Sequence, residues 1–315
     1  MPIGELAAAS CSFLWAACSL AFAFAGRRVG GAAVNQIRIH MALVVLFGLH
    51  ALVVGSLWPE ALSTRQLTGL AVSGLVGLSL GDLFLFVCMA AIGPRFGTLL
   101  MATSPLMTVA IEWLFLGEVV TSWALVGIAV TTACVALVLI DPRGADGWRG
   151  AGAPRGMPVW PVVAGLLGAL GQATGLVLAR DALRAVDPGE VDVPTLSAVL
   201  VRMTAGAIGV VVIAMATGRM RGTLRALRDR TAMRATAIGV VFGPVLGVWM
   251  SQVAIQHAKA GASAALMSLS PVLMVPIARI AYGARPGFLA VLGTLGAVGG
   301  SVLIVLAQDA ARGVS

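Results

Sequence analysis

Charged residues are scarce in this sequence. Asp, Glu, Lys and Arg make up 11% of the 315 residues, whereas a soluble domain carries about 25%. Apolar residues make up 59% instead, and a soluble core has no use for so many over this length. The composition therefore excludes an ordinary soluble protein and predicts an all-α integral membrane protein.

Metal-ligating residues are also few. The four cysteines all fall inside apolar runs, without metal-ligand spacing: Cys11, Cys18, Cys88 and Cys134. The three histidines are scattered and form no His-Glu-x-x-His motif: His40, His50 and His257. We interpret the cysteines as small apolar residues and predict neither a metal site nor a cofactor.

Tyrosine occurs once, which excludes one class of membrane enzyme. Intramembrane aspartyl proteases use a Gly-x-Gly-Asp motif and a Tyr-Asp motif on a second helix. Here the first motif reads Ser79-Leu80-Gly81-Asp82, and Tyr282 is followed by Gly283. A single deep Asp cannot form the catalytic dyad, so we predict that the protein is not an enzyme.

The basic residues are almost all Arg, 20 of 21, and the net charge is +8. Most lie between apolar runs rather than on a polar domain, which argues against nucleic-acid binding. Cytoplasmic loops of a multi-pass protein carry an excess of Arg and Lys. The partners expected from this pattern are the lipid bilayer and a small-molecule solute.

Ten apolar segments are long enough to cross a membrane. They span residues 3–25, 33–57, 67–92, 95–116, 121–141, 158–180, 193–217, 233–256, 261–282 and 286–308. A Gly-, Pro- and Arg-rich linker, residues 142–157, separates five segments in 1–141 from five in 158–308, and 309–315 form a short tail. Each half has an odd number of spans, so the second half must enter the membrane from the opposite side.

The two halves resemble each other. Slid by 166 positions without a gap, "LLMATSPLMTVAIEWLFLGE" (99–118) overlays "ALMSLSPVLMVPIARIAYGA" (265–284). Inverted repeats are a common device of transporters, in which two halves form one site between them. Pro105 and Pro271 recur at matched positions, so we expect each to kink its helix and act as a hinge, with a packing kink as the alternative.

Polar side chains inside the apolar segments are the candidate site. Asp82 can carry a proton or pair with a cation, or form an ion pair with Arg38 or Arg202. Arg38 and Arg202 occupy similar places in the second and seventh segments, where they can bind an anionic group or reach an interface. The weaker candidates for a pore lining are Gln172, Gln252, Trp15, Trp249 and Glu112; both Trp residues can instead belong to the interface belt.

The motifs "LGDLFLF", "AIGPR", "SPLM" and "EWLFLGE", and "LMSLSPVLMVP" in the second half, resemble the drug/metabolite transporter superfamily, in particular its EamA-type permeases. The resemblance covers nearly the whole chain. It implies secondary transport of a small metabolite, often export and commonly coupled to protons, in the inner membrane of the cell by a monomer or homodimer. A lipid-carrier flippase and a channel-like permease are the alternatives, although paired kinked helices favour alternating access.

The loop arginines predict the orientation. The loops after odd-numbered segments hold 13 Arg, and the other loops and the tail hold five Arg or Lys residues. The positive-inside rule places the first set in the cytoplasm and therefore both termini outside. Members of the EamA family are usually drawn with both termini in the cytoplasm, the opposite orientation.

A fusion at the C-terminus tests this orientation. Alkaline phosphatase, which is active only outside the cytoplasm, should be active when fused after Ser315. A green fluorescent protein at the same site should stay dark. An inactive phosphatase with a bright fluorescent fusion would reverse the orientation.

Overall fold

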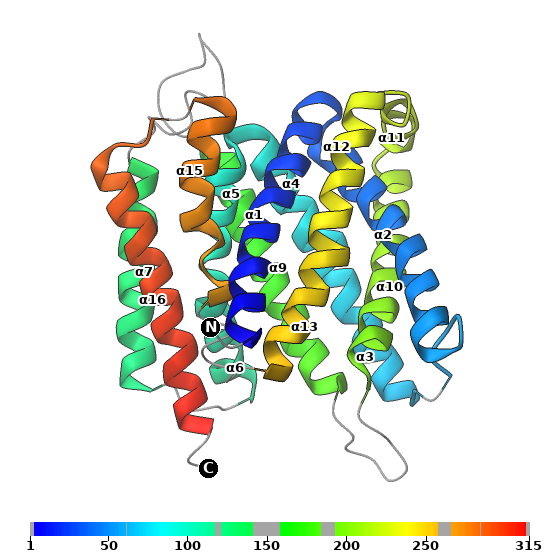
Figure 1. The fold of residues 1–315 in the computed structure, drawn as a ribbon, viewed down its shortest axis with the longest axis horizontal. Coiled ribbons are helices and arrows are strands. Elements are labelled where there is room, and N and C mark those ends of the chain that lie inside the picture. Colours follow the sequence, from blue (N-terminus) through cyan, green and yellow to red (C-terminus); the bar gives the residue numbers. More distant parts are fainter. Residues whose placement is uncertain are drawn as a thin grey trace.

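The fold is entirely helical over the residues that the computed structural model describes, which are 3–60, 62–116, 121–140, 158–183, 193–257, 266–283 and 285–312 (Figure 1). The first half contains α1 (Ile3–Val29), α2 (Gly31–Val54), α3 (Thr64–Gly74), the π-helix η1 (Leu75–Gly81), α4 (Asp82–Ile92), α5 (Pro94–Met101), α6 (Ser104–Leu116) and α7 (Ser122–Ile140). The second half contains α9 (Val159–Leu183), α10 (Thr195–Ala216), α11 (Met220–Ala226), α12 (Arg230–Val240), the π-helix η2 (Val241–Gly247), α13 (Val248–His257), α15 (Ser270–Tyr282) and α16 (Phe288–Arg312). The predicted linker, 142–157, lies outside the described residues.

Eight helices in the described ranges are long and apolar enough to cross a membrane. Three of them join several elements end to end: α3, η1 and α4 form one, α5 and α6 another, and α12, η2 and α13 a third. Two further apolar helices, Ser122–Val138 and Ser270–Tyr282, are shorter. They correspond to the fifth and ninth predicted segments, so length alone supports eight of the ten expected spans.

Large apolar side chains cover the outside of the bundle. Leu52, Phe115, Ile280 and Phe288 are each at least 77% exposed. Soluble monomers rarely expose apolar surface on this scale, because it would drive association in water. Lipid tails are the solvent that this surface fits, so the multi-pass membrane character predicted from composition is confirmed.

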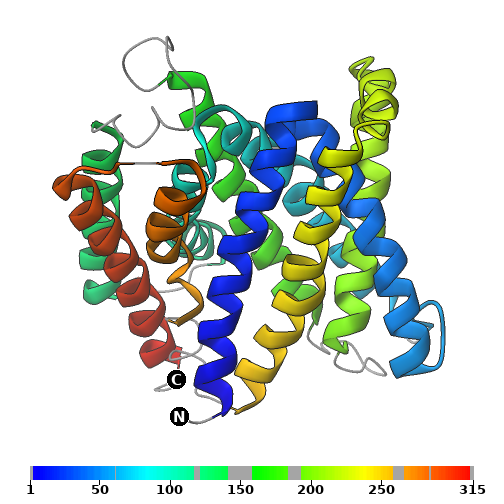
Figure 2. The same ribbon diagram turned by 45° about the horizontal axis from the view of Figure 1, so that its top comes forward.

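The two halves run in opposite directions. In Figures 1 and 2, α1 begins on the lower side, beside the N-terminus, whereas α9 begins on the upper side. Likewise α2 descends, whereas α10 rises to α11 at the top. Both ends of the chain lie on the lower side, as an even number of crossings requires.

Helices α7 and α16, which occupy matched places in the repeat, pack side by side. A Cβ at Gly127 would meet the carbonyl oxygen of Gly300, and a Cβ at Gly293 would meet that of Cys134. Between these contacts, the Thr131 hydroxyl donates to the carbonyl of Ala297, 166 positions away. As the chain runs along α7 from Gly127 to Cys134, it contacts residues of α16 with lower and lower numbers, so the two helices are antiparallel. Shifting Gly127 by 166 positions gives Gly293, and shifting Cys134 gives Gly300, so the two outer contacts are equivalent under the repeat.

The two π-helices also occupy matched positions. Leu75–Gly81 becomes Val241–Gly247 when it is shifted by the same 166 positions. In η1 the Asp82 N–H donates to the Gly77 carbonyl, five residues back; in η2 the wider turn contains Pro244. Single π-turns inside α-helices are rare and concentrate at functional sites.

The repeat prolines stand at the starts of helices, so the kink expected at each takes the form of a break just before it. The chain breaks just before each proline: Ala102 N–H bonds to the Leu99 carbonyl at 3.0 Å, and Leu269 N–H to the Leu266 carbonyl at 3.2 Å. Pro105 and Pro271 are then the second residues of α6 and α15. In the first turn of a helix the missing N–H of proline costs nothing.

Glycines let the backbones around η1 approach closely. A Cβ at Gly74 would lie 2.1 Å from the carbonyl oxygen of Arg202 in α10. A Cβ at Gly171 in α9 would lie 2.6 Å from the Cα of Gly81. Small residues at such crossings are the usual way in which membrane helices pack tightly, and here they bring α9 and α10 against the segment that leads into Asp82.

Substituting one of these glycines should destabilise the bundle. Gly74→Ala forces a methyl group into the Arg202 carbonyl, and overpacking of this kind costs about 1–3 kcal/mol. Gly48→Ala is the matched control, because a Cβ at Gly48 meets no atom within 4 Å. Thermal unfolding of the purified protein in detergent should show a lower Tm for Gly74→Ala only; equal Tm values would contradict the close packing.

Candidate functional site

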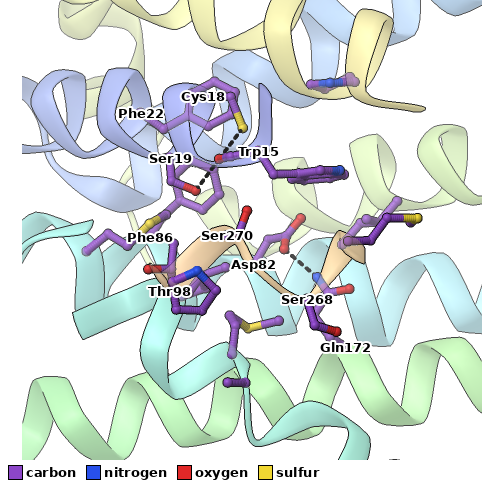
Figure 3. Close-up of a pocket in the computed structure, with 18 of the residues that line it drawn as sticks. Trp15, Cys18, Ser19, Phe22, Asp82, Phe86, Thr98, Gln172, Ser268 and Ser270 are labelled. Carbon is purple, nitrogen blue, oxygen red and sulfur yellow. Dashed lines mark hydrogen bonds between the residues drawn. The ribbon is translucent and has the colours of Figure 1, made fainter. Parts of the chain in front are cut away.

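A cavity of about 490 Å³ lies between the two halves. Its walls come from α1, α2, η1, α4, α5 and α6 of the first half and from α9, α10, η2, α15 and α16 of the second. Figure 3 shows Trp15, Phe22 and Phe86 on one side of Asp82 and Gln172. The volume falls within the range of small-molecule sites, roughly 300–1,000 Å³.

Asp82 is the only acidic residue among the described residues of the cavity wall, and it is 6% exposed. It begins α4, directly after η1, so the π-turn determines where its side chain points. One carboxylate oxygen accepts a hydrogen bond from Arg38 and forms an ion pair with it. The other oxygen accepts from Nε2 of Gln172, as Figure 3 shows, and Gln172 also donates to the Gly77 carbonyl at 3.2 Å.

Hydrogen bonds and aromatic rings surround the guanidinium group of Arg38. Its Nε and Nη2 donate to Oδ1 of Asn35, at 3.2 and 3.0 Å. Its guanidinium carbon lies 4.8 Å from the ring centre of Phe86 and 5.9 Å from that of Phe22. An Arg against aromatic faces gains cation–π attraction, which is stronger where water is excluded. Of the two ion pairs that the sequence left open for Asp82, the structure contains the one with Arg38.

Arg202 also reaches the cavity, from α10, but it is not hydrogen-bonded to Asp82. Its Nε is buried and has no hydrogen-bond partner within the described part of the chain. Its Nη2 lies beside Gly77, 3.6 Å from where a Cβ of that residue would stand. A buried donor without a partner is costly, so this one requires an explanation.

Seven of the ten predicted site residues line this one cavity: Trp15, Arg38, Asp82, Pro105, Gln172, Arg202 and Pro271. Gln252 belongs to α13, and its side chain lies outside what the structure describes. Trp249 and Glu112 are not among the residues that line this cavity. Trp249 is 55% exposed on the outside of the bundle, as an interface or lipid-facing Trp would be.

Glu112 does not line the cavity either. It is buried in α6, and its Oε1 accepts a hydrogen bond of 2.6 Å from Nη1 of Arg180 in α9. The Arg180 side chain is 33% exposed, whereas that of Glu112 is 5% exposed. This pair joins α6 to α9 and satisfies the carboxylate that sequence reasoning left without a partner.

Several residues of the cavity wall do not stand out by residue type in the sequence. Phe22 and Phe86, which flank Arg38, look like any other apolar residues, and so do the methionines Met101 and Met267. The repeat could have found the methionines, because they are matched at the offset of 166. Pro244 could have been found in the same way, since its mate Leu78 lines the cavity too.

Comparison with known proteins identifies the class. The model of the EamA-like transporter family matches residues 2–140 and again residues 159–306. The chain belongs to this family. No curated protein matches the sequence. A solved structure described only as "Crystal structure of protein" shares the fold, with a TM-score of 0.61 over 97% of both chains at 18% identity.

Membership of this family indicates a membrane transporter of the drug/metabolite type. Its environment is the lipid bilayer, and its cargo is a small molecule. The two family matches correspond to the two halves on either side of the linker, and the cavity lies between them.

Proposed function

We propose that the protein is a secondary active transporter that exports a small solute by alternating access. In this proposal ten crossings form two inverted five-helix repeats in the inner membrane, and protons drive the cycle through Asp82. The observation that carries the proposal is the cavity between the halves, which places a single buried carboxylate in contact with Arg38 and Gln172. The antiparallel packing of α7 on α16 supports the inversion.

The surroundings of Asp82 suit a proton-coupling group because they act on the charge of its carboxylate in opposite directions. Burial disfavours the charged carboxylate, which loses its hydration, whereas Arg38 and the Gln172 amide favour it. A small change in these contacts between two conformations then shifts the balance between the protonated and ionised forms. That is the requirement for a group that takes up a proton on one side of the membrane and releases it on the other.

Protonation of Asp82 also has a mechanical consequence. A neutral carboxyl group no longer holds Arg38, and an uncompensated buried charge is strongly destabilising. The cavity wall around η1 and α2 must then rearrange or accept a compensating charge. The proton state of Asp82 is thereby linked to the conformation of the two halves.

The second part of the proposal is that the breaks before Pro105 and Pro271 allow the halves to switch. An Ala at either position restores an N–H that can bond four residues back, so the two short helices can merge into one. Pro105→Ala and Pro271→Ala should each slow transport severalfold without loss of expression.

Pro276→Ala is the matched control, since Pro276 lies within α15, is exposed and does not line the cavity. Uptake rates in proteoliposomes measure the effect. Wild-type rates in both variants would show that the breaks only serve packing.

Asp82→Asn tests the coupling. It preserves the shape of the side chain and removes the titration, so accumulation driven by a pH gradient should fall at least tenfold. Exchange of labelled for unlabelled solute at equal pH should partly survive, because it needs no net proton movement. Both are measured on the purified protein in proteoliposomes, with Asp82→Glu expected to retain part of the accumulation.

Asp181→Asn is the control for replacing a carboxylate by an amide, because Asp181 is exposed and lies outside the cavity. Thermal unfolding establishes that each variant is folded. If folded Asp82→Asn still accumulates solute after a pH step, Asp82 is not the proton site, and the carboxylate only serves to hold Arg38.

A further inference from the structure

The cavity wall carries one positive charge more than it carries negative charge. Over the part of the chain that the structure describes, the charged residues of this wall are Asp82, Arg38 and Arg202. Asp82 and Arg38 compensate each other through their ion pair, and Asn35 and Gln172 saturate the remaining hydrogen bonds of the pair. The charge of Arg202 is therefore left over.

The backbone of Arg202 is held closely against the first half. Gly74, the last residue of α3, contacts the Arg202 backbone where no side chain larger than hydrogen fits. The buried Nε finds no acceptor within the described residues, and no carboxylate there lies within ion-pair distance of the guanidinium. A partly desolvated guanidinium with a free donor is a receptor for a carboxylate, which it can bind through two parallel hydrogen bonds.

Three of the five hydroxyl groups on the described cavity wall are already engaged. Ser19 donates to the Trp15 carbonyl, Thr98 to the Pro94 carbonyl and Ser270 to the Ser12 carbonyl. Few donors remain for a solute rich in hydroxyl groups, such as a sugar. A doubly charged anion would find no second uncommitted cation among the described residues of the cavity wall.

The rest of the cavity wall is apolar, and many of its side chains are flexible. Four methionines, Met89, Met101, Met203 and Met267, line it together with aromatic rings. Methionine side chains are flexible and polarisable, so they adapt to apolar groups of different shapes. A compact apolar body fits such walls better than a polar one.

We infer that the transported solute is a small organic mono-anion, with a carboxylate that pairs with Arg202 and an apolar body that packs on the methionines and aromatic rings. This inference rests on the proposed transport function. In it Arg202 is the specificity-determining residue, while Asp82 and Arg38 remain the coupling pair. A cation is disfavoured because Arg38 already occupies Asp82, and a zwitterion leaves its ammonium group without a partner.

Three probes with the same phenyl body test the inference: phenylacetate, phenylalanine and 2-phenylethylamine. Binding is measured by isothermal titration calorimetry on the full chain in lipid nanodiscs at neutral pH. Phenylacetate should bind at least tenfold more tightly than the other two. Arg202→Gln should weaken phenylacetate binding at least tenfold, and Arg202→Lys, which preserves the charge, should weaken it less.

Arg279→Gln is the matched control, because Arg279 is exposed in α15 and does not line the cavity; it should bind phenylacetate as the wild type does. Thermal unfolding confirms the folded state of each variant. Tighter binding of phenylalanine or phenylethylamine, binding of none of the three, or unchanged binding in Arg202→Gln and Arg202→Lys would each overturn the inference.

Equilibrium binding does not depend on transport, so the two proposals can fail separately. A protein that binds phenylacetate through Arg202 but never moves it across a membrane contradicts the transport function and leaves the anion site standing. A protein that accumulates phenylethylamine in response to a pH gradient supports the transport function and overturns the anion inference.

Discussion

The ion pair between Arg38 and Asp82 constrains the centre of the molecule. Two opposite charges inside an apolar bundle gain little net stability over an apolar pair of the same size, whereas losing either partner is costly, about 3–5 kcal/mol. The surrounding structure is built to preserve the pair: Asn35 braces Arg38, Gln172 reaches across from the second half, and η1 directs Asp82 inward. Packing alone would not require such a pair, which supports the proposal that Asp82 titrates during transport.

The repeat explains how one site can form between two halves. Contacts between α7 and α16 come in mates at the offset of 166, with Thr131 and Ala297 near their centre. Such contacts are possible only where two similar helices meet antiparallel across a local two-fold axis. The two π-helices are also 166 positions apart. In each half, the helix that follows in the chain is interrupted beside the cavity, just before Pro105 or Pro271. Elements with irregular backbone hydrogen bonding from both halves therefore line the same cavity.

The sequence was sufficient for the order of the helices and for the centre of the site. Charges inside apolar runs are so rare that Asp82, Arg38 and Arg202 stood out without any structure, and all three line the cavity. Trp249 and Glu112 could not be separated from the wall residues, because one sequence does not show which face of a helix points inward, nor that Arg180 lies beside Glu112. A proline within an apolar run is equally consistent with a kink and with the start of a new helix. The π-turns depend on tertiary packing against α9 and α10, which a pattern of single residues does not contain.

The apolar residues of this cavity occur in pairs related by the repeat, whereas its carboxylate does not. Its apolar wall is paired across the repeat: Leu78 with Pro244, Met101 with Met267, and Pro105 with Pro271. The carboxylate is not paired, because the mate of Asp82 is the apolar Val248. Gating must be equivalent from the two sides of the membrane, so the moving parts benefit from being duplicated. A solute with one charged end needs one receptor, and a second carboxylate would place like charges together in a medium of low dielectric constant. Duplicated apolar and proline positions together with one unduplicated carboxylate are therefore what the proposed alternating access to an asymmetric solute requires.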